Sequence, residues 1–84
     1  MDQLDAMRVY VAVVESQGFT AASRVLGMPV PTVCRKVAYL EEELGVQLLV
    51  RSTRNVSATS SGMHYYDDAR RILEDINGAS RRVA

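Results

Sequence analysis

The chain has 84 residues, 48% of them hydrophobic, and its ten basic and ten acidic residues cancel. A domain this small buries only about 60–65% of the surface that its unfolded chain exposes, so it needs a disulfide, a metal or a partner chain for stability. The single cysteine, Cys34, excludes an internal disulfide, and with one histidine, His64, it cannot form a four-ligand structural zinc site. We therefore expect an oligomer.

The charge pattern and the hydropathy further restrict the class of protein that this chain can be. No apolar run approaches the ~18 residues of a membrane span, and the first five residues are acidic, unlike a signal peptide. Residues 16–40 and 44–66 carry basic side chains and no acid, and they flank the run Glu41–Glu43. This pattern fits one basic face on a neutral molecule, although it also fits a mixed, solvated surface. We expect a soluble, cytoplasmic domain that binds no cofactor and no membrane.

Two helices are predicted in the first third of the chain. Asp2 is expected to cap the first helix, and Gly18 is expected to end it. Thr20 should cap a short second helix over residues 21–26, which Gly27 ends. The first helix is indicated by apolar residues at helical spacing, Leu4, Met7, Val11 and Val14.

A third helix is predicted from Pro31, which suits a first helical turn, to Gly45. Its apolar stripe consists of Val33, Val37, Leu40 and Leu44. The opposite face carries Pro31, Arg35 and Ala38, flanked by Thr32, Cys34 and Tyr39. The Glu41–Glu43 run is expected to be a solvated helix end.

A β-hairpin and a long helix complete the predicted elements. Residues 48–51 and 56–58 read as two short strands around the polar segment 52–55. Thr59 should cap the last helix, and Gly78 should make this helix fray beyond Ile76 because glycine costs about 1 kcal/mol in a helix. The last helix carries apolar residues at heptad spacing, Tyr65, Ala69, Ile72, Ile76, Ala79 and Val83.

The second and third helices with their tight turn form a helix-turn-helix, and the hairpin adds a wing. Small and basic side chains at the N-terminal end of the third helix suit entry into the DNA major groove. Bulk would hold the helix away from the bases, whereas arginine can bond guanine through two atoms. From residue pattern alone we therefore expect a mainly α fold: a winged helix-turn-helix of three helices and a short hairpin, then a long helix with a heptad seam.

Between Leu4 and about Ile76 the chain resembles the N-terminal DNA-binding module of LysR-type transcriptional regulators. The segments that carry the resemblance are Leu4–Arg8, Phe19–Ser23, Leu26–Gly27, Pro31–Val37, Leu40–Val46, Leu48–Arg54, Ser57–Thr59 and Gly62. The resemblance implies a winged helix-turn-helix over residues 1–58, with the recognition helix at about 31–44 and the wing at about 48–58. It also implies that residues 59–84 form a linker helix that pairs two chains antiparallel. A C-terminal domain absent from this chain would bind a small-molecule effector in the complete regulator.

The predicted DNA-binding residues have different roles. Arg35 is expected to read a base, although a surface arginine that meets solvent is the alternative. Arg51 and Arg54 should reach phosphates or the minor groove, unless Arg51 only covers apolar surface with its stem. The predicted DNA contacts are Val30, Pro31, Thr32, Cys34, Arg35, Lys36, Arg51 and Arg54, and the predicted dimer contacts are Tyr65, Ala69, Ile72, Ile76 and Ala79.

The sequence departs from the family pattern at the start of the third helix. Family members commonly have a Ser-Gln-Pro segment there, with a serine just before the position of Arg35. This chain has Pro29, Val30, Pro31 and Cys34. Val30 can offer a base only methyl contacts, and Cys34 is interpreted as a replacement for serine rather than a redox sensor.

Enzymatic alternatives lack the necessary residues. The sequence has no Gly-rich phosphate loop and no supported Ser/His/Asp or Cys/His arrangement, and His64 has no evident co-ligand. Two functions therefore remain: sequence-specific binding of double-stranded DNA, and a winged-helix protein-interaction module that does not bind DNA.

Overall fold

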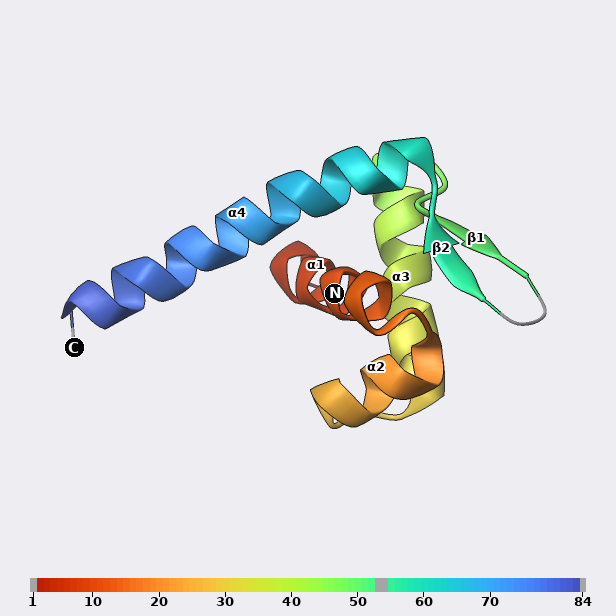
Figure 1. The fold of residues 1–84 in the computed structure, drawn as a ribbon, viewed down its shortest axis with the longest axis horizontal. Helices are drawn as coiled ribbons and strands as arrows, with labels where there is room; N and C mark the ends of the chain where they lie inside the picture. The colour runs from red at the N-terminus through yellow and green to blue at the C-terminus, as the bar shows by residue number, and fades with distance from the viewer. Residues whose placement is uncertain (1, 53–54, 84) are drawn as a thin grey trace.

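The computed structural model describes residues 2–52 and 55–83 (Figure 1). In this view α1 lies near the centre, α2 lies below it, and α3 runs from beside α2 toward the start of α4. The hairpin and the start of α4 lie at the opposite end of α3 from α2. The elements in chain order are α1 (Gln3–Ser16), α2 (Phe19–Leu26), α3 (Val30–Leu44), β1 (Leu49–Arg51), β2 (Val56–Ala58) and α4 (Ser60–Val83).

The first two helix boundaries only partly follow the prediction. Asp2 caps α1 as expected, because its carboxylate accepts a hydrogen bond from the Leu4 amide at 3.2 Å. The residue that ends α1 is Gln17 and not Gly18: Gln17 adopts the left-handed conformation, with φ 59°. The prediction that Thr20 caps α2 is also wrong. The helix already begins at Phe19, after Gly18 in an extended conformation, and no side chain caps it.

Helix α3 and the hairpin follow the prediction closely. Pro31 lies in the first turn of α3, and Gly45 ends the helix at φ 69°. Strands β1 and β2 pair antiparallel, with Leu49 opposite Ala58 and Arg51 opposite Val56. The turn residues Thr53 and Arg54 lie outside the described part of the chain.

Helix α4 is longer than predicted. Thr59 caps it as expected, because its Oγ1 accepts from the Gly62 amide at 2.9 Å. The expected fraying beyond Ile76 is wrong, since the helix continues through Gly78 to Val83. One glycine costs about 1 kcal/mol in a helix interior, and two arginines in the last turn, Arg81 and Arg82, favour this helix end by interacting with the helix dipole.

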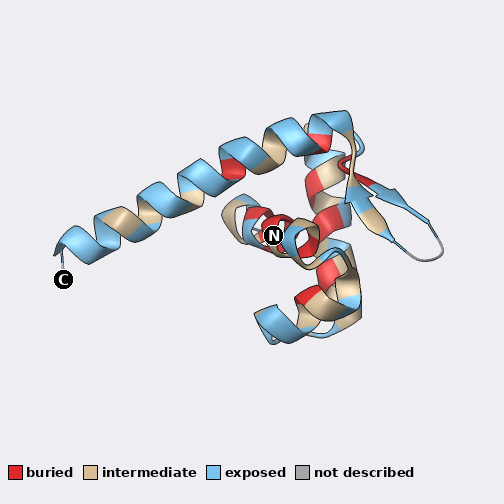
Figure 2. Ribbon diagram, viewed as in Figure 1, coloured by how far each residue is buried: buried red, intermediate tan, exposed pale blue. Residues whose placement is uncertain are grey.

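The main core lies where α1, α2, α3 and β1 meet (Figure 2). Its fully buried side chains are Ala6, Val9, Tyr10, Val13, Ala22, Val33, Val37, Leu40, Leu48 and Leu49. A second cluster joins Met7 and Val11 of α1 to Ala69 of α4. Helix α4 is therefore fixed to the rest of the molecule along its first half, and its second half projects past α1 (Figure 1).

The carbonyl oxygen of Leu48 marks the point where α1, β1 and α4 converge. It accepts hydrogen bonds from the buried Tyr10 hydroxyl at 3.0 Å and from the Thr59 amide at 3.1 Å. Gly62 of α4 approaches so closely that a Cβ there would lie 2.2 Å from this oxygen and 2.5 Å from the Tyr10 hydroxyl. These contacts fix the direction in which α4 leaves the winged helix.

Candidate nucleic-acid interface

Helix α3 has one buried face and one exposed face. Val33, Val37 and Leu40 are fully buried in the core. On the opposite side Arg35 and Ala38 are exposed, and Pro31 is exposed at the start of the helix, whereas Val30, Thr32 and Cys34 are half-buried. The outward face of α3 therefore has the predicted composition: small side chains around one arginine, with no acidic residue before Glu41.

Arg35 does not extend freely into solvent. Its Nη2 donates a hydrogen bond to Thr32 Oγ1, one turn earlier, at 3.3 Å. Both side chains are on the surface, so this bond restrains the guanidinium toward the N-terminal end of α3 without burying it. That end of a recognition helix is the part that contacts base edges in helix-turn-helix complexes.

Lys36 points to the side of α3 that faces α1. Its ammonium group forms an ion pair with the Asp5 carboxylate, and only 19% of its side chain is exposed. The DNA contact expected of Lys36 remains a prediction, and the Asp5 carboxylate would compete with a DNA phosphate for this ammonium group.

Arg51 packs against the start of α2. Its guanidinium carbon lies 4.9 Å from the centroid of the Phe19 ring, and its Nη2 lies 3.9 Å from Glu41 Oε1. The side chain is still 48% exposed. It therefore covers apolar surface, as in the alternative interpretation, while its charged end stays open to solvent. Arg54, the other wing arginine, lies outside the described residues.

Glu41 has a structural role that the sequence did not indicate. Its Oε2 accepts hydrogen bonds from the amides of Leu48 and Leu49, at 2.8 and 3.3 Å. The expectation of a solvated acidic run therefore holds for the exposed Glu42 and Glu43 and is wrong for Glu41. By holding the start of β1 against the end of α3, Glu41 sets the position of the wing relative to the recognition helix.

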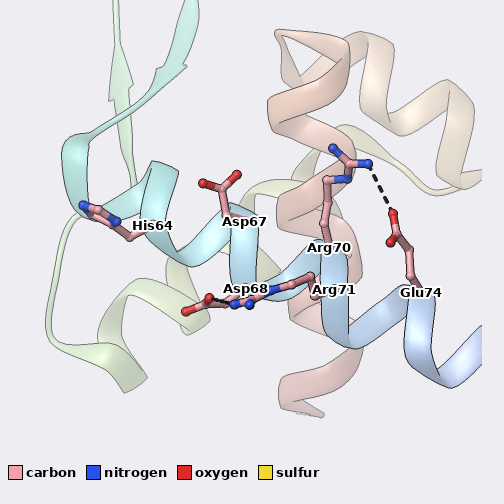
Figure 3. A pocket seen from close by; sticks show the side chains of 6 residues that line it. All are labelled: His64, Asp67, Asp68, Arg70, Arg71 and Glu74. Carbon is pink, nitrogen blue, oxygen red and sulfur yellow. Dashed lines mark hydrogen bonds and ion pairs between the residues drawn. The ribbon is translucent and has the colours of Figure 1, made fainter.

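The outer face of α4 is polar and mixed in charge. A shallow cavity of about 550 Å³ lies there (Figure 3), lined by His64, Asp67, Asp68, Arg70, Arg71 and Glu74. Arg70 pairs with Glu74 at 3.2 Å, and Arg71 pairs with Asp68. Within residues 2–52 and 55–83, no group of three or more His, Cys, Asp and Glu side chains could hold a metal ion. His64 therefore belongs to no metal-holding group of side chains within these residues.

The heptad seam of α4 divides into two parts. Tyr65 and Ala69 pack against α1 of the same chain, with Ala69 fully buried and the Tyr65 ring 5.7 Å from that of Tyr10. These two predicted dimer contacts therefore lie against α1 of their own chain, and their contact with a second chain remains a prediction. Further along, Ile72 is 43% exposed and Val83 is 89% exposed, and Ala79 is also exposed. Only this second half offers an open apolar surface.

Helices α1 to α3 and the antiparallel hairpin that follows them form a winged helix-turn-helix domain, in which α3 has the exposed face. The family model described as "Bacterial regulatory helix-turn-helix protein, lysR family" matches residues 4–63. The chain belongs to this family, and it is a DNA-binding domain of the winged helix-turn-helix type that LysR regulators contain. In the described ranges, no helix combines the length and apolar character needed to cross a bilayer.

Individual relatives agree with this assignment. The chain is 45% identical over 83 residues to the HTH-type transcriptional activator AaeR of Escherichia coli strain K12, covering 99% of this chain and 27% of that protein. The BenM DNA-binding domain in complex with catB site 1 DNA superposes with a TM-score of 0.93 at 38% identity, covering 99% of this chain and 91% of that one. The CbnR DNA-binding domain in its DNA complex superposes with a TM-score of 0.90 at 35% identity, covering 99% of this chain and 94% of that one. The chain spans about a quarter of the length of the curated relatives it matches.

Proposed function

We propose that this chain binds double-stranded operator DNA sequence-specifically as one module of a bacterial transcriptional regulator. The observation that carries the proposal is the two-sided character of α3. Val33, Val37 and Leu40 of its apolar stripe are fully buried, which packs the helix against the core, and its outward face presents Arg35 between small side chains. A helix of this kind can enter the major groove, which is about 12 Å wide, without its side chains blocking the approach.

Base contacts and backbone contacts are assigned to different elements. Arg35 bonds guanine O6 and N7, and the Thr32 hydroxyl restrains it before binding. Val30, Pro31 and Cys34 at the start of α3 contact base edges or thymine methyl groups. Phosphate contacts are assigned to Lys36, Arg51 and Arg54, the last of which could also enter the minor groove.

The proposed active form is a homodimer joined through α4, with the winged helix in residues 1–58 and the linker in residues 59–84. Support comes from the apolar surface that Ile72, Ala79 and Val83 expose on the projecting half of α4. A two-fold dimer would present two recognition helices to two half-sites, as helix-turn-helix dimers do. In the complete protein, a further domain would bind a small-molecule effector, and the regulator would act in the cytoplasm.

Selection of bound sites from a random duplex pool, followed by anisotropy titrations over a range of salt concentrations, tests this proposal. We expect a selected duplex to bind far more tightly than a scrambled one. The affinity should fall steeply with rising salt concentration, because the counterions that binding releases from the DNA then gain less free energy. Arg71→Ala, which removes one positive charge from the outer face of α4, serves as the control and should leave the preference unchanged. If the folded chain binds neither duplex at low salt, this result would instead support the alternative function, a winged-helix protein-interaction module that does not bind DNA.

A further inference from the structure

The exposed end of α4 carries two unlike charges on one line of the helix. Asp75 and Arg82 are seven residues apart and both are exposed. Seven residues are two turns, so the two side chains point in the same direction about 10 Å apart along the axis. That separation is too large for an ion pair within one helix. In the described part of the chain, neither residue forms an ion pair, whereas Arg70 and Arg71 on the outer face both do.

These charges flank the open half of the apolar seam. Ile72, Ile76, Ala79 and Val83 occupy the central heptad positions, and Asp75 and Arg82 each immediately precede one of them, at the position that faces a partner helix across the rim of a coiled coil. The apolar surface and the charges therefore belong to one face of α4. A ligand for this face must cover the apolar residues and offer an acid and a base in the opposite order.

We propose that this face binds a second copy of the chain antiparallel, in the register that places Asp75 of each copy opposite Arg82 of the other. The inference rests on the homodimer proposed above and adds its register. A two-fold axis between the two charges, near Gly78, creates two identical ion pairs. The same axis places Ile76 beside Ala79 of the second copy and Ile72 beside Val83, so each layer of the interface joins two apolar side chains.

The alternative arrangements fit this face less well. An antiparallel register centred on residue 74 would place Asp75 beside Asp75 of the second copy, which is repulsive. It would place Arg82 beside Asp68, whose carboxylate already pairs with Arg71 of its own chain. That register would also require Tyr65 and Ala69 at the interface, although both pack on α1 and Ala69 is fully buried. A parallel pair would bring Asp75 level with itself and near Ser80, with no opposite charge. The register centred near Gly78 uses the projecting half of α4, where Ile72, Ala79 and Val83 are exposed and Ile76 is half-buried, and it pairs two charges that have no ion-pair partner within the described part of the chain.

Charge reversal tests the register directly in the 84-residue chain. Asp75→Arg or Arg82→Asp turns two attractions into two repulsions, so we expect the dimer dissociation constant from sedimentation to rise about tenfold. The double variant D75R/R82D restores both pairs and should return to within about twofold of the original value. A mixture of the two single variants should form heterodimers in preference to either homodimer, since both of its pairs are again opposite in sign.

Asp67→Arg is the matched control, because it makes the same charge change on the outer face of α4 (Figure 3). It should leave the dissociation constant unchanged, and in 1 M salt the differences among all variants should shrink because of screening. A dimer whose affinity the double variant fails to recover would overturn the register while leaving the homodimer intact. A chain that sediments as a monomer at every concentration would overturn both.

Discussion

Substitution of Gly62 by alanine should destabilise the domain, contrary to the usual effect of this change in a helix. An alanine Cβ would lie 2.2 Å from the Leu48 carbonyl oxygen and 2.5 Å from the Tyr10 hydroxyl. Ordinary contacts begin near 3.4 Å, so α4 must move by about 1 Å relative to β1. The atom in the way is backbone, which cannot rotate aside as a long side chain would.

The cost of Gly62→Ala follows from these contacts. Overpacking of a well-packed site costs about 1–3 kcal/mol. Separating Leu48 from α4 also weakens the hydrogen bonds from Tyr10 and Thr59, each worth about 1 kcal/mol. The total of about 3–5 kcal/mol is a large part of the roughly 4–13 kcal/mol expected for a domain of this size. Since 1 kcal/mol shifts Tm by about 4–8 °C, we expect Tm to fall by at least about 12 °C.

Gly78→Ala in the same helix is the matched control. The nearest atom to its Cβ would be Arg82 Nη1 at 3.4 Å, the end of a flexible side chain. This change should therefore stabilise the protein by about 0.5–1 kcal/mol through helix propensity alone. Thermal and urea unfolding followed by far-UV circular dichroism at one protein concentration measures both variants. A Gly62→Ala protein as stable as the Gly78→Ala protein would refute the close approach at this junction.

Three further changes test separate parts of the account. Burial, with Glu41 and Tyr65 nearby, raises the pKa of Tyr10 to about 12. The unfolded chain loses this proton from about pH 10, so stability should fall between pH 10 and 12 by about 2–3 kcal/mol, and the pH-dependent unfolding of Tyr10→Phe should lack this contribution. Cys34→Ser should keep DNA affinity within about 1 kcal/mol, and a large peroxide response that disappears in this variant would show that Cys34 is a redox sensor. Ile72→Glu should sediment as a monomer, and an unchanged dimer would exclude this residue from the interface.

Regular spacing made the helices predictable from sequence. The apolar stripe of α3, with Val33, Val37 and Leu40, is buried as the period indicated, and Thr59 caps α4 as its side-chain chemistry suggested. The ends between α1 and α2 were harder, since Gly18 and Thr20 both suit a helix boundary. The chain instead turns at Gln17, a residue that seldom takes a left-handed conformation.

Contacts between distant residues could not be predicted in this way. Tyr10 and Leu48 are 38 positions apart, and Lys36 and Asp5 are 31 apart. Nothing in the local pattern distinguishes Glu41, which bonds to β1, from its neighbours Glu42 and Glu43. The heptad stripe likewise could not show which partner covers it: α1 covers Tyr65 and Ala69 within the chain. Pairing between remote segments depends on the assembled fold, which periodicity does not encode.

The central claim is that Arg35 on the open face of α3 reads a base, and one comparison tests it most directly. Arg35→Ala and the control Arg71→Ala each remove one positive charge, and each is titrated onto the selected duplex and onto its scrambled counterpart. We expect Arg35→Ala to cost about 1–3 kcal/mol on the selected duplex and little on the scrambled one, while Arg71→Ala leaves the ratio between the two duplexes unchanged. An equal loss on both duplexes for Arg35→Ala would show that this arginine only contacts phosphate, and it would contradict the account of the recognition helix.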